Sequence, residues 1–552
     1  MSTLQFTIMN EITGPFLGHV TDRTAKIWIQ CGEPSSLFAR SLWVTIHPES
    51  VTSPSRGPSE RMELDPITLN AGSLTIQNLE PDTLYFYRLW KDESATQPLD
   101  LQGLELDDLR LKTFPRNGYE KQLDFLIMSC HNPFTSLEDG EEGFAVWGQI
   151  SRVIEENKNV RFVILAGDQI YGDEIEAKVK KEKDPQIRLR LYLFLYKKFW
   201  NHLSYRKILS RLPAMMMWDD HDITDGWGSR EDSFKDEKSS EFSSHWSALF
   251  QTAKEAFTVM QASRNPDPLD QKEGFDFCFK VGRAGFCLMD LRSHRNVRLP
   301  RITTEKQRAL VKSWVAQHRN EIDTFFFVST VVFSHGAPLI EDWVLKYWFY
   351  FLDFLKLLKK IKFLKGWTKS LSDRVGDLRD DINDSWGAEV NAGEADEILE
   401  FLFDLQNSKT EKPVHVVILS GDIHTPGYAT LYSSDKGHLQ RATIPHITAT
   451  PVSYKPFSWI GEAVYRHLTQ SIKLGRKGVF SSQVSHHYCS RNVVLLSLRD
   501  FQNGESQLKV KYYLEGYPEP QIMLFDLNRS SHREAISWSH PKRTGSQMLP
   551  QG

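Results

Sequence analysis

The stretch VRFVILAGDQIYGD, residues 160–173, joins a short apolar run to a loop that carries aspartate and tyrosine. A run as short as Val160–Leu165, without polar interruption, favours a strand buried on both faces. Asp168 and Tyr171 follow this strand on a turn that begins with glycine. In layered α/β folds, functional side chains lie on the loops beyond the carboxyl ends of strands. This stretch therefore predicts one edge of an active site.

Three further clusters of polar residues end similar apolar runs. They are Met128-Ser-Cys-His-Asn-Pro133, Met217-Trp-Asp-Asp-His-Asp222 and Leu419-Ser-Gly-Asp-Ile-His-Thr425. A single aspartate near a strand end more often caps a helix or closes a turn than binds a metal. Four clusters at equivalent places beyond their strands favour instead a shared site rich in metal-binding residue types.

The sequence pattern around these clusters is that of an α/β domain, which we place at residues 119–527. Apolar runs short enough for buried strands recur along it, and helix-like segments separate several of them, which indicates a layered α/β architecture. The runs are Leu123–Met128, Val160–Leu165, Ala214–Met217, Phe286–Met289, Phe325–Phe333 and Val414–Leu419, with further probable strands at Val493–Leu498, Leu508–Leu514 and Gln521–Phe525. Residues 528–552 form a polar C-terminal tail.

The N-terminal part, residues 1–118, has the pattern of an all-β sandwich. Thr24–Gln30, Leu42–Ile46 and Ser73–Ile76 are short strand candidates between polar, proline-rich turns. The segment LEPDTLYFYRL, residues 79–89, resembles the tyrosine corner of immunoglobulin-like and fibronectin-like sandwiches. This part has no catalytic cluster, so we interpret it as a packing or substrate-shaping module.

Composition excludes several classes of protein. The chain has 552 residues, of which 40% are hydrophobic, and its net charge of −4 argues against a surface that coats nucleic acids. The five cysteines form no CxxC motif, so neither a zinc knuckle nor a disulfide framework is indicated. Cys278 and Cys287 flank a turn predicted at Val281–Gly285, and we expect them to form a reduced pair across a hairpin. The sequence does not indicate an oligomeric state.

The sequence predicts a cytoplasmic protein, because it has neither a secretory signal nor about 18 to 20 uninterrupted apolar residues. One segment, WVLKYWFYFLDFLKLLKKIKFLKGW (Trp343–Trp367), is rich in leucine, aromatic residues and lysine. It predicts a helix too interrupted by charge to span a bilayer. Either this helix packs on the core or caps the pocket, or it contacts a membrane surface, which would make the protein peripheral to a membrane.

The order of the four clusters resembles that of the calcineurin-like metallophosphoesterases, and more closely that of the PhoD-like (alkaline phosphatase D) phosphatases. In the PhoD-like pattern a cysteine follows a serine, and GDxxY, WDDH and SGDxH come next in order. The matching residues here are Cys130, Asp168, Tyr171, Asp220, His221, Asp422 and His424. Asp290–His294 and Asp384–Gly387 are also similar to family segments. The resemblance implies two packed β-sheets flanked by helices, preceded by a β-sandwich.

The resemblance also implies a dinuclear or larger metal centre. Iron would be held by Cys130, Asp168, Tyr171 and His424, because a thiolate and a phenolate together suit ferric iron. Asp220 and Asp422 would make the neighbouring site rich in carboxylate oxygen, which favours calcium. Manganese or zinc are the alternatives. His335 follows another strand and is either a further ligand or a hydrogen-bonded histidine at a strand end.

The implied function is hydrolysis of a phosphate monoester or diester by a metal-activated hydroxide. His221 would protonate the leaving group or hold a phosphoryl oxygen. Asn132 and Arg292 are candidates for gripping the phosphate, although Arg292 could instead pair with a carboxylate such as Asp222. Two alternatives stay open: phospholipase-D-like hydrolysis of phospholipids, and a catalytically silent scaffold. A serine hydrolase is disfavoured because no Gly-x-Ser-x-Gly elbow is present.

Overall fold

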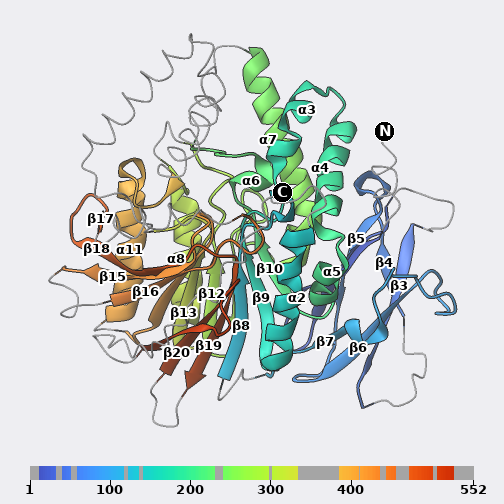
Figure 1. Ribbon diagram of the computed structural model, residues 1–552, viewed down its shortest axis with the longest axis horizontal. Helices are drawn as coiled ribbons and strands as arrows, with labels where there is room; N and C mark the ends of the chain where they lie inside the picture. Colours follow the sequence, from blue (N-terminus) through green and yellow to red (C-terminus); the bar gives the residue numbers. More distant parts are fainter. Residues whose placement is uncertain are drawn as a thin grey trace, which may run out of the picture.

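The protein is described by a computed structural model that covers residues 12–32, 40–50, 59–116, 122–135, 141–229, 240–296, 301–333, 384–408, 411–435, 443–455, 472–500 and 506–527. His335, the segment Trp343–Trp367 and the tail from residue 528 lie outside the described residues. Figure 1 shows a β-rich N-terminal part beside a larger body of sheets and helices.

The larger body is built on two β-sheets. The first has the order β10-β9-β8-β19-β20-β21 and the second the order β11-β12-β13-β14-β16-β15-β18-β17. The first comprises β8 (Gln122–Met128), β9 (Val160–Ala166), β10 (Ala214–Met217), β19 (Asn492–Asp500), β20 (Ser506–Leu514) and β21 (Gln521–Asp526). The second comprises β11 (Phe277–Val281), β12 (Ala284–Leu288), β13 (Thr324–Ser329), β14 (His415–Ser420), β15 (Gly427–Ser433), β16 (Thr443–Thr448), β17 (Ile472–Leu474) and β18 (Phe480–His487).

Aromatic side chains join the inner faces of the two sheets. The ring of Phe125 in β8 meets the rings of Phe286 in β12 and Phe326 in β13 edge-on, with centroids 5.2 and 5.1 Å apart. All three side chains are fully buried in one hydrophobic cluster. Such edge-to-face contacts are favourable beyond the area that they bury. The predicted pair of packed sheets is therefore present.

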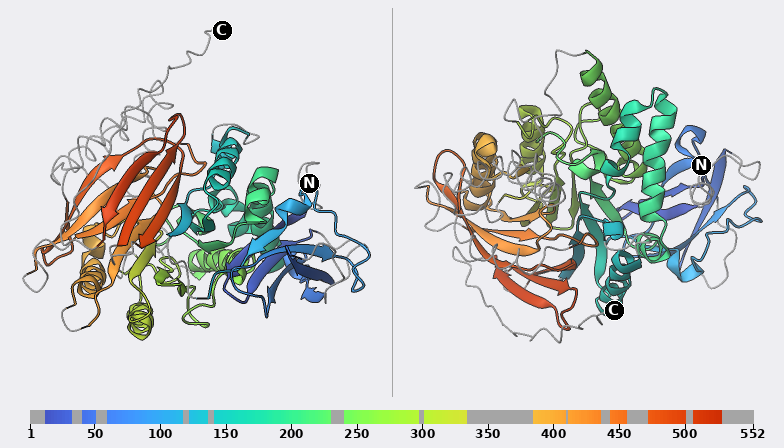
Figure 2. Two further views of the ribbon diagram at one scale, coloured as in Figure 1. Left: turned by 90° about the horizontal axis from the view of Figure 1, so that it is seen from below. Right: turned by 45° about the horizontal axis from the view of Figure 1, so that its top comes forward.

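Helices lie on part of the outer face of each sheet (Figures 1 and 2). Side chains of α8 (Glu305–His318) and α11 (Ala392–Asn407) share a hydrophobic cluster with β13 and β14. On the other side, α2 (Glu141–Glu156), α4 (Pro185–Trp200), α5 (Leu203–Leu209) and α7 (Ser240–Met260) contribute to the larger cluster around the first sheet. No helix in the described ranges is long and apolar enough to cross a membrane.

Local sequence signals explain where several helices begin. Asp184 caps α4 by accepting a hydrogen bond from the backbone N–H of Gln186 at 2.8 Å, with Pro185 in the first turn. Thr304 and Gln307 form a capping box at the start of α8, where each side chain bonds the backbone of the other.

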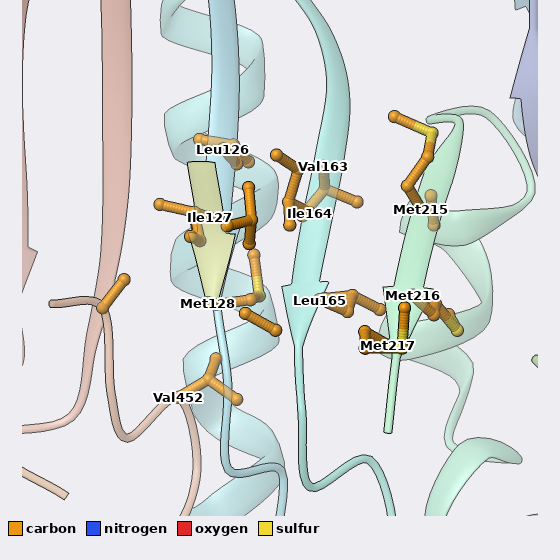
Figure 3. Packing of buried hydrophobic residues seen from close by; sticks show 14 of the residues in the cluster. Leu126, Ile127, Met128, Val163, Ile164, Leu165, Met215, Met216, Met217 and Val452 are labelled. Atoms are coloured by element: carbon orange, nitrogen blue, oxygen red, sulfur yellow. The ribbon is translucent and has the colours of Figure 1, made fainter. Parts of the chain in front are cut away.

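The strands that carry the polar clusters are parallel, so their carboxyl ends meet at one edge. In the first sheet β8, β9 and β10 run in the same direction, and Figure 3 shows them ending side by side. In the second sheet β12, β13, β14 and β16 are parallel. One predicted strand was too long: β13 ends at Ser329, not at Phe333. Val331, Val332 and Phe333 are buried in the following loop, so their apolar run reflects burial without strand geometry.

The N-terminal part forms two small sheets. One contains β1 (Thr13–Val20), β2 (Ala25–Gln30) and β5 (Ala71–Ile76), and the other has the order β4-β3-β6-β7, with β3 at Ser41–Pro48, β4 at Glu60–Glu63, β6 at Leu84–Trp90 and β7 at Arg110–Lys112. The predicted tyrosine corner is confirmed, because the Glu80 N–H donates to the Tyr85 hydroxyl at 2.7 Å.

The predicted cysteine hairpin, in the second sheet, is confirmed too. Cys278 and Cys287 pair across β11 and β12, and both are free.

Buried arginines join this sandwich to the larger body. Arg264 is fully buried, with its guanidinium 5.0 to 5.1 Å from the ring centres of Phe16, Trp28 and Trp200. Arg206 donates to the carbonyl oxygens of Gly14 and Leu101 at 3.0 and 2.5 Å. The domain boundary at residue 118 stays a prediction.

Candidate functional site

Loops that follow four parallel strands bring the predicted metal-binding residues together. The ligand atoms of Cys130, Asp168 and His424 lie within 4.8 Å of one another. A second group, Asp168, Asp219, Asp220 and Asp422, meets the same criterion and shares Asp168 with the first. A third group contains Asp220, His221 and Asp225. A carboxylate common to two groups is the arrangement that a bridged pair of metal ions requires.

An unusual backbone conformation turns four of these side chains toward the common point. Cys130, Asp168, Asp422 and His424 all adopt positive φ angles, between 50° and 71°. Non-glycine residues adopt this left-handed conformation at a cost of about 1 kcal/mol or more, and it persists only where surrounding contacts impose it. Here the Cys130 N–H donates to the Gly167 carbonyl at 3.3 Å, and this hydrogen bond joins the loops after β8 and β9.

Two glycines allow the loops to pack this closely. Gly167 has a φ of 96°, and a Cβ atom there would lie 2.7 Å from the Cβ of Asp219. A Cβ atom on Gly421 would lie 2.8 Å from the Cβ of Ser129 and closer still to the Ala166 carbonyl oxygen. The glycine that precedes the aspartate in the second and fourth clusters is thus required by steric contact between loops.

Asp222 connects the second and third clusters. Its carboxylate accepts from the backbone N–H groups of Asp168 and Asp219, each at 2.9 Å, and from that of Gln169 at 3.2 Å. It also accepts from the side-chain amide of Gln261 at 2.9 Å. This carboxylate therefore fixes the two loops and is not a member of the ligand groups.

Arg292 lies behind the carboxylates. It is fully buried, and its side-chain N–H groups bond Asp219, Asp220 at 3.2 Å, Asp384 at 3.0 and 2.6 Å, and the Trp227 carbonyl at 3.1 Å. These bonds occupy all five donors of the guanidinium. If Arg292 bound phosphate directly, some of these hydrogen bonds would have to break. Asp222, the carboxylate predicted as its alternative partner, is not among the acceptors.

The electrostatics of the centre favour a bound cation. Burial raises the pKa of Asp168 well above its usual value, and Asp220 and Asp219 raise it further against the opposing His221. Burial and Asp168 likewise raise the pKa of the Cys130 thiol, and burial with Cys130 raises that of Tyr171. Metal ions compete with protons for such groups, so a cation can take the place of these protons.

Buried oxygen atoms without a hydrogen-bond partner give a second indication that the centre can hold metal ions. Among the described residues, Asp168 Oδ1, Asp219 Oδ2 and the Tyr171 hydroxyl are buried with no hydrogen-bond partner. A buried polar atom without a partner costs free energy unless another group satisfies it. Metal coordination would satisfy all three, and oxygen and thiolate donors are suitable ligands.

The other carboxylates and histidines titrate differently. Burial raises the pKa of Asp219 to about 6 against the opposing charge of Arg292. For Asp220 burial acts in the same direction, but Arg292 and His221 outweigh it and lower the pKa. Burial and His221 lower the pKa of His424 to about 3, so this imidazole is neutral and has a lone pair to offer a metal.

His221 belongs to the third ligand group, and one of its ring nitrogens is already hydrogen-bonded. Its Nδ1 lies 2.7 Å from Asp173 Oδ2, and its ring is tilted by 33° against that of Tyr171, with centroids 4.3 Å apart. Burial alone would lower its pKa, but Asp173 and Asp220 raise the pKa well above its usual value.

Two further predicted residues remain. Asn132 is buried, and its side-chain oxygen accepts from the Phe134 N–H at 3.2 Å. His335 is outside the described residues, so its role stays a prediction.

The sequence did not single out four residues that the structure places at or around this centre. Asp219 precedes the predicted Asp220, and the double aspartate was the only available signal. Asp384 lies in a segment similar to the family but had no assigned role. Thr450 and Tyr454, in the loop after β16, belong to none of the motifs.

Comparisons with known proteins agree with this geometry. Residues 125–319 match the family model of the PhoD-like phosphatases. A solved structure of PhoD aligns over 96% of this chain and 92% of that chain, with a TM-score of 0.62 and 13% identity. A purple acid phosphatase from yellow lupin (Lupinus luteus) seeds aligns over 92% of this chain and 72% of that chain, with a TM-score of 0.51 and 12% identity. At these identities the two structures show the fold alone.

A curated relative is also similar in sequence. An uncharacterized protein of Saccharomyces cerevisiae is 24% identical over 368 residues, which span 56% of this chain and 50% of the yeast protein. The present chain thus covers half the length of that relative. Together with the fold and the gathered clusters, the family match shows that residues 125–319 belong to the PhoD-like phosphatase family.

Proposed function

We propose that the chain is a metal-dependent phosphoesterase that hydrolyses phosphate monoesters or diesters. The observation that carries this proposal is Asp168, a buried carboxylate that belongs to two groups of ligand atoms at once. Paired metal sites that share a ligand are typical of enzymes that displace groups at phosphorus. The family match at residues 125–319 supports the same reaction class.

The donor atoms suggest which metals the two halves would hold. Cys130, Tyr171 and His424 supply sulfur, phenol oxygen and nitrogen, and a set with thiolate and phenolate suits ferric iron. Asp219, Asp220 and Asp422 supply carboxylates, which suit calcium. Asp168 would be common to both halves. Manganese or zinc in either half is the alternative that metal analysis would distinguish.

When bound, the metal ions would lower the pKa of water to supply a nucleophile near neutral pH and would offset the charge of the phosphoryl oxygens. The residues of the chain prepare the site for this chemistry. Arg292 holds Asp219 and Asp220 and neutralises part of their charge. Asp222 fixes the loops that carry Asp168 and Asp219.

His221 is the proposed proton donor to the leaving group. Its Nδ1 is bonded to Asp173, and Nε2, 4.0 Å from Asp225 Oδ1, is the nitrogen that would face a substrate. Against the effect of burial, Asp173, which is in none of the ligand groups, raises its pKa, and this favours the protonated ring that a departing alkoxide needs. Asn132, at the end of the loop after β8, remains a candidate contact to the phosphate.

The test is hydrolysis by the purified chain of an aryl phosphate monoester, an aryl phosphate diester and phosphatidylcholine vesicles. Each assay is run after chelation and again after iron, calcium, manganese or zinc is restored. Turnover of an aryl ester that returns with metal is expected. Turnover of the vesicles alone would favour the phospholipase-D-like alternative, and metal-loaded protein inert on all three would contradict the proposal. A chain that neither binds metal nor turns over any ester would be a scaffold.

A further inference from the structure

The loop that follows β16, residues 449–455, contacts the centre at Cys130 and His424. It contributes no residue to the three ligand groups, and neither Thr450 nor Tyr454 belongs to a motif. Both side chains nevertheless touch predicted ligands. Their roles are therefore not explained by the proposed reaction.

Thr450 contacts the predicted thiolate ligand. Its hydroxyl is buried, 3.0 Å from Cys130 Sγ and 3.1 Å from the Asp422 carbonyl oxygen. A hydroxyl has one proton to donate, and a thiolate is an acceptor that cannot donate in return. When Cys130 binds a metal as a thiolate, Thr450 is thus placed to donate to the sulfur and to fix its orientation.

Tyr454 contacts the predicted histidine ligand. Its ring lies 3.9 Å from that of His424 at an interplanar angle of 16°, and 5.5 Å from that of Tyr171 at 26°. Tyr454 thus stacks on two rings that are both predicted to bind the metal. Its own backbone N–H donates to the Cys130 carbonyl at 3.2 Å.

Hydrogen bonds to the segment after β8 and to the segment before β19 hold the loop in place. The Val452 N–H donates to the Ser129 carbonyl at 2.8 Å, and Arg491 Nε donates to the Ser453 carbonyl at 3.0 Å. The Ser453 hydroxyl lies 2.9 Å from Nδ1 of the buried His131, whose Nε2 lies 3.0 Å from the Phe199 carbonyl oxygen. Because the backbone of the loop is held in this way, the side chains of the loop have fixed positions.

We infer that Thr450 and Tyr454 are positioning residues of the metal centre, Thr450 through its hydrogen bond to the Cys130 sulfur and Tyr454 through its stacking on the His424 ring. This inference rests on the proposed metal-dependent function. Groups that orient metal ligands typically change metal affinity or activity by about 10- to 100-fold when they are removed.

The experiment uses the full chain loaded with Co²⁺, which reports thiolate ligation through a sulfur-to-cobalt absorption band. Thr450→Val removes the hydroxyl at nearly constant volume, and Thr450→Ser retains it. Thr324→Val is the matched control, because Thr324 is buried at the start of β13, away from the centre. We expect Thr450→Val to shift the band and to weaken cobalt binding about 10- to 100-fold, with Thr450→Ser close to the parent and Thr324→Val unchanged.

The stacking is tested in parallel. Tyr454→Leu should weaken cobalt binding while Tyr454→Phe, which keeps the ring, should not, and circular dichroism of each variant verifies that it is folded. A folded Thr450→Val protein with the band and affinity of the parent, or a Tyr454→Leu protein that binds cobalt normally, would overturn the inference and leave the proposed function intact. A parent protein that binds no cobalt would overturn the proposed function and the inference together.

Discussion

At the scale of single residues, Arg292 is the group on which the buried carboxylates depend. It forms ion pairs with Asp219, Asp220 and Asp384, and its own side chain is fully buried. Arg295 adds a second ion pair to Asp384 at 2.6 Å. Removing one partner of a buried ion pair leaves uncompensated charge, which costs more than the pair itself contributes.

We therefore expect Arg292→Met to lower the free energy of unfolding by about 3 to 5 kcal/mol. Arg283→Met is the matched control, because Arg283 pairs with Asp323 at the surface and should cost about 0 to 1 kcal/mol. Urea unfolding of both variants in the presence of a chelator measures the difference. Equal losses for the two variants would contradict the role of Arg292.

A second prediction concerns Asp276, which belongs to none of the ligand groups. It is buried and accepts from the Asp290 N–H at 2.8 Å and from the Gln307 amide at 3.0 and 3.1 Å. Burial, with the charge of Asp290, raises its pKa to about 7. The unfolded chain should titrate near its usual pKa of about 4. The folded state therefore binds more protons between these values, and stability falls as pH rises through this window.

Asp276→Asn removes this titration, so the Tm of the variant relative to that of the parent should increase from pH 5 to pH 8. Thermal unfolding of both proteins across this range measures the difference. A Tm difference that does not depend on pH would show that Asp276 ionises normally in the folded protein.

The sequence predicted much of the centre at this scale but not all of it. Cys130, Asp168, Asp422 and His424 each follow an apolar run, and the structure gathers them as that pattern predicts. Asp219 was missed because neighbouring residues in a loop differ only in the direction of their side chains, which spacing does not encode. Whether Arg292 faces phosphate or carboxylates was open for the same reason.

At the scale of elements, the close packing of the strand-end loops sets the geometry of the site. Gly421 lies between β14 and the residues Asp422 and His424, and it packs against Ser129 and Ala166. A side chain at this position would push the fourth cluster away from the first and second.

Gly421→Ala should accordingly reduce metal binding and lower stability by about 1 to 3 kcal/mol, the usual cost of overpacking. Gly148→Ala is the control: Gly148 lies inside α2, and a Cβ added there would meet no atom of the described residues within 4 Å. Alanine at this helical position should therefore be neutral or stabilising by about 0.5 to 1 kcal/mol. Metal titration and urea unfolding of the two variants would separate the effects. Normal metal affinity in Gly421→Ala would contradict the steric argument.

Strands with a continuous apolar run were predicted, whereas others were missed. The sequence did not identify β15 or β18, which pair with each other in the second sheet. β18 reads FSSQVSHH and is only partly buried, so it lacks the apolar run that marks a strand buried on both faces. Its pairing with β15 comes from the tertiary structure and not from local sequence.

At the scale of the whole molecule, the N-terminal sandwich packs on the larger body of two sheets as part of one structure. The Tyr87 hydroxyl donates to the Ser210 carbonyl at 2.6 Å, and this bond is buried. Trp28 Nε1 donates across the same junction to the Val259 carbonyl at 2.9 Å. These partners lie more than a hundred residues apart in the sequence, so the sandwich could be predicted but its docking could not.

We expect Tyr87→Phe to lower the stability of the whole chain by about 0.5 to 1.5 kcal/mol or more, because it leaves the Ser210 carbonyl without this donor. Tyr85→Phe serves as a control within the sandwich, since its hydroxyl accepts from the Glu80 N–H there. Calorimetry should show one transition that both substitutions shift. Two transitions, with Tyr85→Phe affecting only the first, would show that the sandwich unfolds independently.

The proposed function requires that Asp168 belong to two metal sites at once. The most direct test is the metal content and aryl phosphate turnover of Asp168→Asn beside Asp124→Asn, a buried aspartate in β8 that bonds Gln122 away from the centre. We expect about two metal ions per chain in the parent and in Asp124→Asn, with loss of metal and of turnover in Asp168→Asn. Full metal content and activity in folded Asp168→Asn would contradict it.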